Sequence, residues 1–207
     1  MGSTSPSGQG SRDRRLDGIR ALVGLVGIMW VVQLVNSVDN YDLSKDEGIV
    51  PRSISGLKGV VFSPFLHASW PHLIDNTIPF VILGLIIALA GAWRLLAVTA
   101  IIALVAGLGT WLISPSNSDT VGASGVVFGY ATYLVARGFF NRNALEVGIG
   151  LVVGLLFGAS LLASIVPHAG ISWQDHVFGA IGGVIAARAL TPQRDARPEL
   201  PAATSAL

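Results

Sequence analysis

Three polar clusters interrupt a strongly apolar chain, and each contains residues that can do acid–base, nucleophilic or hydrogen-bonding chemistry. The first, HASWPHLIDN, begins at His67 and ends at Asn76. The second, VGASGVVFG, contains Ser124, and the third, WQDHVFGAIGG, contains His176. Because polar and ionisable groups are costly inside membrane-spanning helices, such clusters indicate a functional site.

A serine and a histidine at one depth of a membrane predict nucleophilic catalysis. At about 1.5 Å per residue, Ser124 lies about 20 Å from Arg137 and His176 about 18 Å from Arg188, the arginines that end their two spans. An imidazole beside a hydroxyl accepts its proton as the oxygen attacks a carbonyl, and then returns the proton to the leaving amine. We therefore predict that Ser124 and His176 form a catalytic pair.

Donors for the developing negative charge are present in the first cluster. His72 and Asn76 are spaced i,i+4, which puts both side chains on one helix face, and Asn76 lies at the depth of Ser124. A tetrahedral oxyanion needs donors aimed at it in advance. The backbone N–H of Ser124 is a third donor, because the first turn of a helix has free N–H groups and the positive end of the helix dipole.

Glycines surround both candidate catalytic residues. Gly122 and Gly125 flank the serine, which keeps Cβ atoms away from a substrate backbone. Gly179 and Gly183 follow the histidine in a G-x-x-x-G spacing, which lets two membrane helices approach closely. We expect these two glycines, together with Gly129, to form the contact between the helices that carry the catalytic pair.

The composition requires a membrane protein. Of 207 residues, 52% are hydrophobic and 12% are charged, whereas soluble domains have about 25% charged residues. The net charge of +1 argues against a nucleic-acid partner, and the absence of cysteine excludes disulfides, thiolate metal sites and a cysteine nucleophile.

Six apolar stretches approach the length of about 20 residues that a helix needs to cross the bilayer. They are 19–36, 73–90, 95–113, 121–136, 147–166 and 173–190. Backbone groups in hydrocarbon must be satisfied within the segment, so we expect an all-α polytopic membrane protein. Residues 1–17 and 191–207 lack apolar periodicity and are predicted to be disordered tails around a membrane domain at 18–190.

The distribution of arginine predicts the orientation, because positively charged loops stay in the cytoplasm. With an inside start, the cytoplasmic side carries Arg12, Arg14, Arg15, Arg20, Arg94, Arg137, Arg142, Arg188, Arg194 and Arg197. The opposite side carries only Lys45, Arg52 and Lys58, in a loop with more acidic than basic residues. Both termini are therefore predicted to be cytoplasmic, and the polar clusters to face the extracytoplasmic side. The composition also favours a bacterial gene, and hence the bacterial plasma membrane.

The three motifs together resemble those of the rhomboid intramembrane serine proteases. GASG at Gly122 to Gly125, H-x-x-x-x-H-x-x-x-N from His67 to Asn76, and H-x-x-G-x-x-x-G from His176 to Gly183 occur in the order and on the spans typical of that family. The resemblance covers residues 18–190.

This resemblance implies a minimal six-helix bundle with a Ser–His dyad. By carry-over, Ser124 is the nucleophile and His176 the general base and acid. His72, Asn76 and the Ser124 amide form the oxyanion hole, and His67 supports them. Substrates are single-span membrane proteins, cut in or near the membrane, and membrane lipids are the other partners. No metal or organic cofactor is implied, and the oligomeric state and natural substrate stay open.

Two features depart from the family pattern. Asp175 precedes the catalytic histidine, where the residue is often small. It either faces solvent or raises the pKa of His176 by its charge, which leaves the pH optimum open. The outer loop also lacks an evident Trp-Arg pair, and we expect Pro51-Arg52 to fill part of the same role.

Other functions stay open from the residues alone. A catalytically silent rhomboid-like protein would escort membrane clients, although the intact dyad argues against it. A small transporter would need charged residues along a path, whereas the polar groups gather in the outer third. A zinc site is disfavoured because H-E-x-x-H is absent. His72 and Asn76 could also serve only as bonds between helices, and His168 is interpreted as an exposed interface residue.

Overall fold

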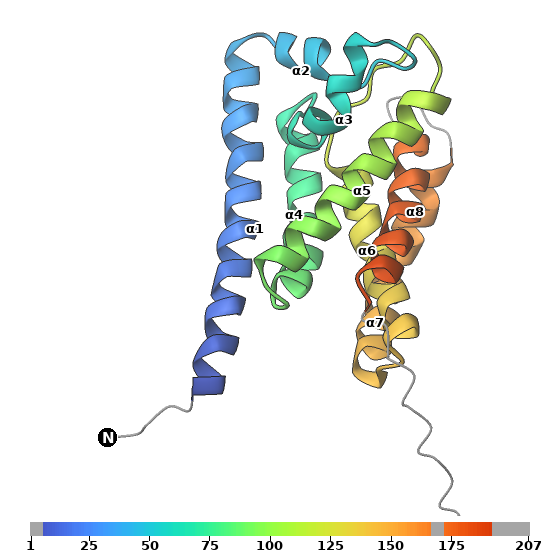
Figure 1. Cartoon of the computed structure of the whole chain (residues 1–207). Helices are drawn as coiled ribbons and strands as arrows, with labels where there is room; N and C mark the ends of the chain where they lie inside the picture. Colours follow the sequence, from blue (N-terminus) through green and yellow to red (C-terminus); the bar gives the residue numbers. More distant parts are fainter. Residues whose placement is uncertain (1–5, 167–171, 192–207) are drawn as a thin grey trace, which may run out of the picture.

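The chain folds as a bundle of helices. The computed structural model describes residues 6–166 and 172–191. The long helices are α1 (Pro6–Val38), α4 (Trp70–Ala88), α5 (Ala92–Ile113), α6 (Ser124–Asn141), α7 (Ala144–Ile165) and α8 (Trp173–Ala189). Between α1 and α4 lie the short elements α2 (Asp42–Glu47), η1 (Ser55–Lys58), α3 (Gly59–Phe62) and η2 (Ser63–Phe65). Figure 1 shows these short elements gathered at one end of the bundle, near the start of α6.

The protein is a membrane protein by the length and apolar character of its helices. Within the described residues, Gln9–Val38, Trp70–Ala88 and Ala92–Ile113 are each long and apolar enough to cross a bilayer. A shorter apolar stretch covers Ala144–Ala159 in α7. The expected all-helical class is therefore confirmed, and the one β contact in the described part of the chain is an isolated bridge between Ile49 and Thr120.

Helix α1 is longer than predicted. It begins at Pro6, so the prediction of a disordered tail is wrong for residues 6–17. The polar residues there include several with good helix propensity, and Arg20 pairs with Asp17 at 3.1 Å, one turn away, so the helix continues beyond its apolar part. The tail predictions for residues 1–5 and 192–207, and the interpretation of His168, concern residues outside those that the structure describes.

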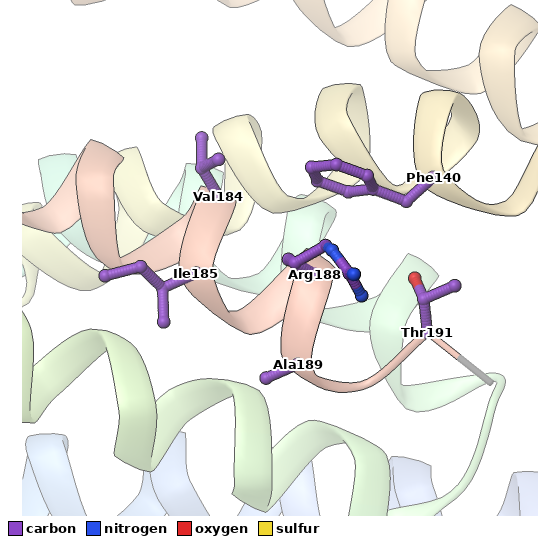
Figure 2. A pocket seen from close by; sticks show the side chains of 6 residues that line it. All are labelled: Phe140, Val184, Ile185, Arg188, Ala189 and Thr191. Carbon is purple, nitrogen blue, oxygen red and sulfur yellow. The ribbon is translucent and has the colours of Figure 1, made fainter. Parts of the chain in front are cut away.

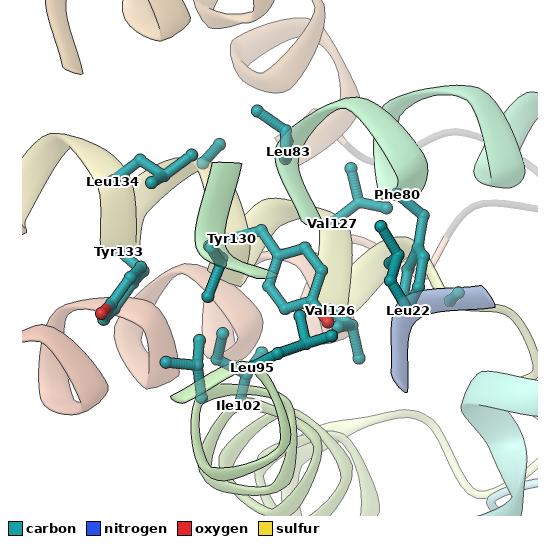
Figure 3. Close-up of a cluster of buried hydrophobic side chains, with 14 of the residues drawn as sticks. Leu22, Phe80, Leu83, Leu95, Ile102, Val126, Val127, Tyr130, Tyr133 and Leu134 are labelled. Carbon is teal, nitrogen blue, oxygen red and sulfur yellow. The ribbon is translucent and has the colours of Figure 1, made fainter. Parts of the chain in front are cut away.

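Helix α6 forms the centre of the bundle. Every residue from Gly125 to Ala131 is buried, and α6 packs against α4, α5, α7 and α8. Figure 3 shows Tyr130 of α6 among apolar side chains from α1, α4 and α5. Its hydroxyl lies 2.6 Å from that of Thr99, so the buried polar atom has a partner. A central α6 fixes the position of the serine at its first residue.

The loop between α1 and α4 is fastened to the same end of the bundle. Ile49 and Thr120 exchange two backbone hydrogen bonds of 2.9 and 3.1 Å just before the GASG sequence. The guanidinium of Arg52 donates to the carbonyls of Leu112 and Ser114 at 3.1 and 2.7 Å, where α5 ends. These carbonyls have no intrahelical donor, so the loop caps α5 and holds the segment that leads into α6.

Candidate active site

The start of α4 orients the two predicted oxyanion donors. Ser69 is the N-cap residue, and its hydroxyl accepts a hydrogen bond from the backbone N–H of His72 at 3.2 Å. The helix therefore begins at Trp70, and His72 and Asn76 occupy successive turns on one face. His72 is half-buried, whereas Asn76 is 7% exposed.

Both side chains converge on Gly122. A Cβ atom at this residue would lie 2.8 Å from Nε2 of His72 and 3.4 Å from Nδ2 of Asn76. Gly122 also has φ of +124°, a conformation that favours glycine, and its N–H donates to the carbonyl of Ser63 at 2.9 Å. The glycine thus leaves a space beside two side-chain nitrogens, two residues before Ser124.

The amide of Asn76 is a free donor in that space. Its Nδ2 atom is buried and has no hydrogen-bond partner within the described residues. An unpaired buried donor costs free energy, about 1–3 kcal/mol, so a native structure that keeps one invites a functional explanation. An anion placed beside Gly122 would give this amide its missing partner.

Ser124 is the first residue of α6 and is half-buried. The N–H groups of the first turn have no intrahelical acceptor, and the helix dipole puts partial positive charge at this end. The prediction that the serine stands at a helix N-terminus is confirmed. The helix begins here and not at residue 121, because Gly122 turns the chain out of the helical conformation.

His176 packs on the face of α6 that carries Ser124. Its ring stacks on Phe128 with centroids 4.2 Å apart and an interplanar angle of 9°. Phe128 follows Ser124 by one turn, so the two side chains share a face of α6. The imidazole is 6% exposed, and the stacking fixes the plane of the ring beside the serine turn.

Backbone contact between α6 and α8 brings these residues together. A Cβ atom on Gly179 would collide with the backbone of Gly125, and one on Gly183 would collide with the carbonyl of Gly129. The close approach predicted from the G-x-x-x-G spacing is therefore present.

Asp175 lies at the same junction and is 6% exposed, which rules out the solvent-facing alternative. Its carboxylate accepts from the backbone N–H of Gly125 and lies in polar contact with the hydroxyls of Ser124 and Thr110. The hydroxyl of Thr110 is close to the carboxylate but does not form a well-aligned hydrogen bond with it. Asp175 therefore connects α8 with α5 and with the first turn of α6.

His67 is fully buried behind His72. The two rings meet edge to face with centroids 5.1 Å apart, and the carbonyl of His67 accepts hydrogen bonds from Asn36 and Ser44 at 3.0 and 3.2 Å. Burial, together with the neighbouring His72, lowers the pKa of the His67 imidazole from 6.5 to about 3. His67 therefore supports His72 as a neutral side chain.

Sequence reasoning missed two residues of this site. Phe128 supports the imidazole, and its i,i+4 spacing from Ser124 was a usable indication. Thr110 reaches Asp175 from α5, and no motif marks it. The five predicted side chains lie near the first turns of α6: His72 and Asn76 beside Gly122, with His67 behind His72, and His176 on Phe128, one turn after Ser124.

Comparison with known proteins now decides the family. The model of the Rhomboid domain matches residues 55–193. The chain belongs to the rhomboid family. An uncharacterized Mycobacterium tuberculosis protein, Rv1337, is 40% identical over 195 residues, which cover 90% of this chain and 81% of that protein.

Two more distant rhomboid relatives have names that refer to the family. The Bacillus subtilis protein named "Putative rhomboid protease YdcA" is 27% identical and the match covers 79% of this chain and 83% of that protein. "Rhomboid-like protein 11, chloroplastic" of Arabidopsis thaliana is 32% identical over 60% of this chain and 49% of its own length.

Proposed function

We propose that this rhomboid is an intramembrane serine endopeptidase that uses Ser124 and His176 as a dyad. The observation that carries the proposal is the convergence of His72 Nε2 and Asn76 Nδ2 on the space beside Gly122. Two aimed donors at the N-terminus of a serine-bearing helix form the arrangement that acyl transfer requires. The histidine stacked one turn along the same face supplies the base.

The reaction proceeds in two halves. The hydroxyl of Ser124 attacks the carbonyl carbon of the scissile peptide bond while His176 accepts the hydroxyl proton. The tetrahedral intermediate collapses, the C–N bond breaks, and His176 gives the proton to the departing amine. Water then attacks the acyl-enzyme with His176 again as base, which releases the acid and restores the serine.

Negative charge develops on the carbonyl oxygen in both halves. This oxygen occupies the space beside Gly122, where it accepts from Nε2–H of His72, Nδ2–H of Asn76 and the N–H of Ser124. Loss of one such donor costs about 10²–10³-fold in rate in serine proteases. The free Nδ2 of Asn76 is therefore the donor whose removal isolates the oxyanion contribution.

The membrane arrangement is part of the proposal. The six long helices cross the bilayer, both termini are cytoplasmic, and the serine end opens to the extracytoplasmic side of a bacterial plasma membrane. Substrates are single-span proteins cut at small residues within or near the outer leaflet, where the helix can unwind. The chemistry uses only groups of the chain and water, without a metal or organic cofactor.

The test is cleavage in proteoliposomes that hold the full chain and a single-span reporter with Ala, Gly and Ser residues at its outer end. Ser124→Ala and His176→Ala are expected to abolish cleavage, and Asn76→Ala to slow it about 10²-fold. Ser118→Ala, at a hydroxyl bonded to the Pro115 carbonyl in the nearby loop, is the control and keeps wild-type cleavage. Full cleavage by Ser124→Ala would refute the proposal, and a wild type inert toward reporter and serine-reactive probe alike would favour the escort function.

A further inference from the structure

A hollow of about 490 Å³ lies between the last turns of α6 and α8, at the end of the bundle opposite Ser124. It is lined by Phe140, Val184, Ile185, Arg188, Ala189 and Thr191. Figure 2 shows Phe140 of α6 across from α8, with the Arg188 guanidinium directed toward Thr191. We call this space the Arg188 hollow. Its residues take no part in the proposed proteolytic site.

The cation of this hollow is unpaired within the described part of the chain. Arg188 makes no ion pair or hydrogen bond with a described residue, whereas two other arginines at this end are engaged. Arg137 pairs with Glu146 at 2.8 Å, and Arg94 donates to the carbonyl of Leu190 at 2.6 Å. The guanidinium of Arg188 is therefore available to an external anion.

Apolar side chains lie next to the guanidinium of Arg188, as the acyl chains of a lipid lie next to its charged headgroup. Val184 and Ile185 precede Arg188 by about one helical turn and are 43% and 45% exposed. At the same end, Trp93 and Phe139 are 79% and 73% exposed, which is the pattern of aromatic side chains at a membrane interface. A charged group on Arg188 thus sits at headgroup level, with hydrocarbon alongside Val184 and Ile185.

Thr191 favours a lipid whose headgroup carries a hydroxyl group. Its hydroxyl already donates to the carbonyl of Ala187 at 2.7 Å, so its oxygen is left as an acceptor. A phosphodiester has no proton to donate to it, whereas a headgroup alcohol has one. The hollow therefore matches an anionic phosphodiester that carries hydroxyl groups.

We propose that the Arg188 hollow binds one anionic phospholipid with a hydroxylated headgroup. The phosphate takes a charge-assisted, two-donor hydrogen bond from the fork of Arg188. A headgroup hydroxyl donates to Thr191, and the first methylenes of an acyl chain lie along Phe140, Val184 and Ile185. This site requires no catalysis, so it stands or falls independently of the proposed proteolytic function.

Native mass spectrometry of the detergent-solubilised full chain tests the site by titration with phosphatidylglycerol, phosphatidylcholine and inorganic phosphate. Wild type is expected to retain one phosphatidylglycerol at least fivefold more tightly than phosphatidylcholine, and inorganic phosphate alone is expected not to compete. Arg188→Gln should weaken phosphatidylglycerol binding at least fivefold. Arg15→Gln removes a charge from an exposed position on α1 and should leave binding unchanged.

A second variant tests the contribution of the space itself to lipid binding, apart from the charge of Arg188. Val184→Trp keeps Arg188 and fills the space from a partly exposed position, so it should weaken phosphatidylglycerol binding while the thermal unfolding midpoint stays at the wild-type value. Wild-type binding by both Arg188→Gln and Val184→Trp would overturn the proposal, as would equal competition by inorganic phosphate. Lipid binding that appears only after removal of residues 192–207 would assign the hollow to the chain's own tail and would also overturn it.

Discussion

At the scale of single residues, Asp175 shows how the serine turn is held. The carboxylate accepts from the N–H of Gly125 and contacts the hydroxyls of Ser124 and Thr110. Asp175 is adjacent in sequence to His176, so we expect its contacts to position His176 relative to Ser124 in the proposed dyad. This is a positioning role that needs a correctly shaped acceptor more than a charge.

Substitution of Asp175 should separate shape from charge. Asp175→Ala removes the acceptor, and the second-order rate of labelling by a fluorophosphonate probe is expected to fall about tenfold or more, which corresponds to about 1.4 kcal/mol. Asp175→Asn keeps a carbonyl oxygen in the same place and should retain most of the rate.

The matched control for Asp175 is Asp119→Asn, an exposed acid in the loop before α6, which should label like wild type. If the labelling rates of Asp175→Asn and Asp175→Ala decrease by the same factor, the charge of Asp175 is the important property, and the positioning role is wrong.

His67 predicts a pH dependence of stability. Its imidazole has a pKa of about 3 in the fold because burial disfavours the charged form. Between pH 6.5 and 3 the unfolded chain therefore binds a proton that the folded chain does not. The free energy of unfolding should fall as pH drops through this window, by up to about 1.4 kcal/mol per pH unit from this group.

The measurement is the thermal unfolding midpoint in detergent at pH 7.5 and pH 4.5. His67→Phe removes the titrating group, so its midpoint should fall less between the two values than that of wild type. An equal decrease of the unfolding midpoint in both proteins would mean that the folded protein does not lower the pKa of His67, which would contradict the prediction.

At the scale of elements, glycine spacing determines how α6 and α8 pack. Gly179→Ala puts a methyl group into the backbone of Gly125, and overpacking of this kind typically costs about 1–3 kcal/mol. Its unfolding midpoint is expected to drop, and fluorophosphonate labelling of the folded fraction should slow because the histidine moves from the serine.

Helix α7 offers the control. Gly154 is exposed and has nothing within 4 Å of its Cβ position, so Gly154→Ala should raise stability by about 0.5–1 kcal/mol through helix propensity alone. A Gly179→Ala protein as stable and as reactive as wild type would contradict the close packing of α6 on α8.

The elements also show what the sequence could predict. Each of the six predicted apolar stretches overlaps a long helix among the described residues, because apolar length depends on local sequence. Helix ends depend on contacts distant in sequence, and the predicted ends differ from the observed ones by up to five residues, apart from the start of α1, which lies 13 residues earlier than predicted. For example, α6 extends to Asn141, since Arg137 and Asn141 both reach Glu146 across the turn into α7.

The sequence did not predict the tertiary contacts between residues that are distant along the chain. The Arg52 clamp on the end of α5 joins residues about 60 positions apart, and the burial of Asp175 depends on α5 and α6. Polar residues near a span end favour solvent by default, and only the fold shows where a buried partner exists.

At the scale of the whole molecule, several arginines lie at the end of the bundle opposite the candidate site. Arg14 lies beside the turn at Gly91 between α4 and α5, and Arg94 bonds to the end of α8. The short elements between α1 and α4 lie at the other end, near the start of α6 (Figure 1). The positive-inside rule then predicts that the arginine end is cytoplasmic.

Single cysteines test this orientation cleanly, because the chain has none of its own. In intact cells, a membrane-impermeant maleimide should label Ser116→Cys, an exposed position after α5, and should leave Ala90→Cys unlabelled until the cells are opened. Labelling of Ala90→Cys alone in intact cells would mean the opposite topology, with the proposed dyad on the cytoplasmic side.

The central claim is that Ser124 attacks while an oxyanion is held beside Gly122, and an experimental structure of the fluorophosphonate adduct tests it most directly. We predict a covalent bond from Ser124 Oγ to phosphorus and a phosphoryl oxygen at hydrogen-bond distance, about 2.7–3.2 Å, from His72 Nε2 and Asn76 Nδ2. A phosphonyl group on another residue, or a phosphoryl oxygen turned away from both nitrogens, would contradict the account.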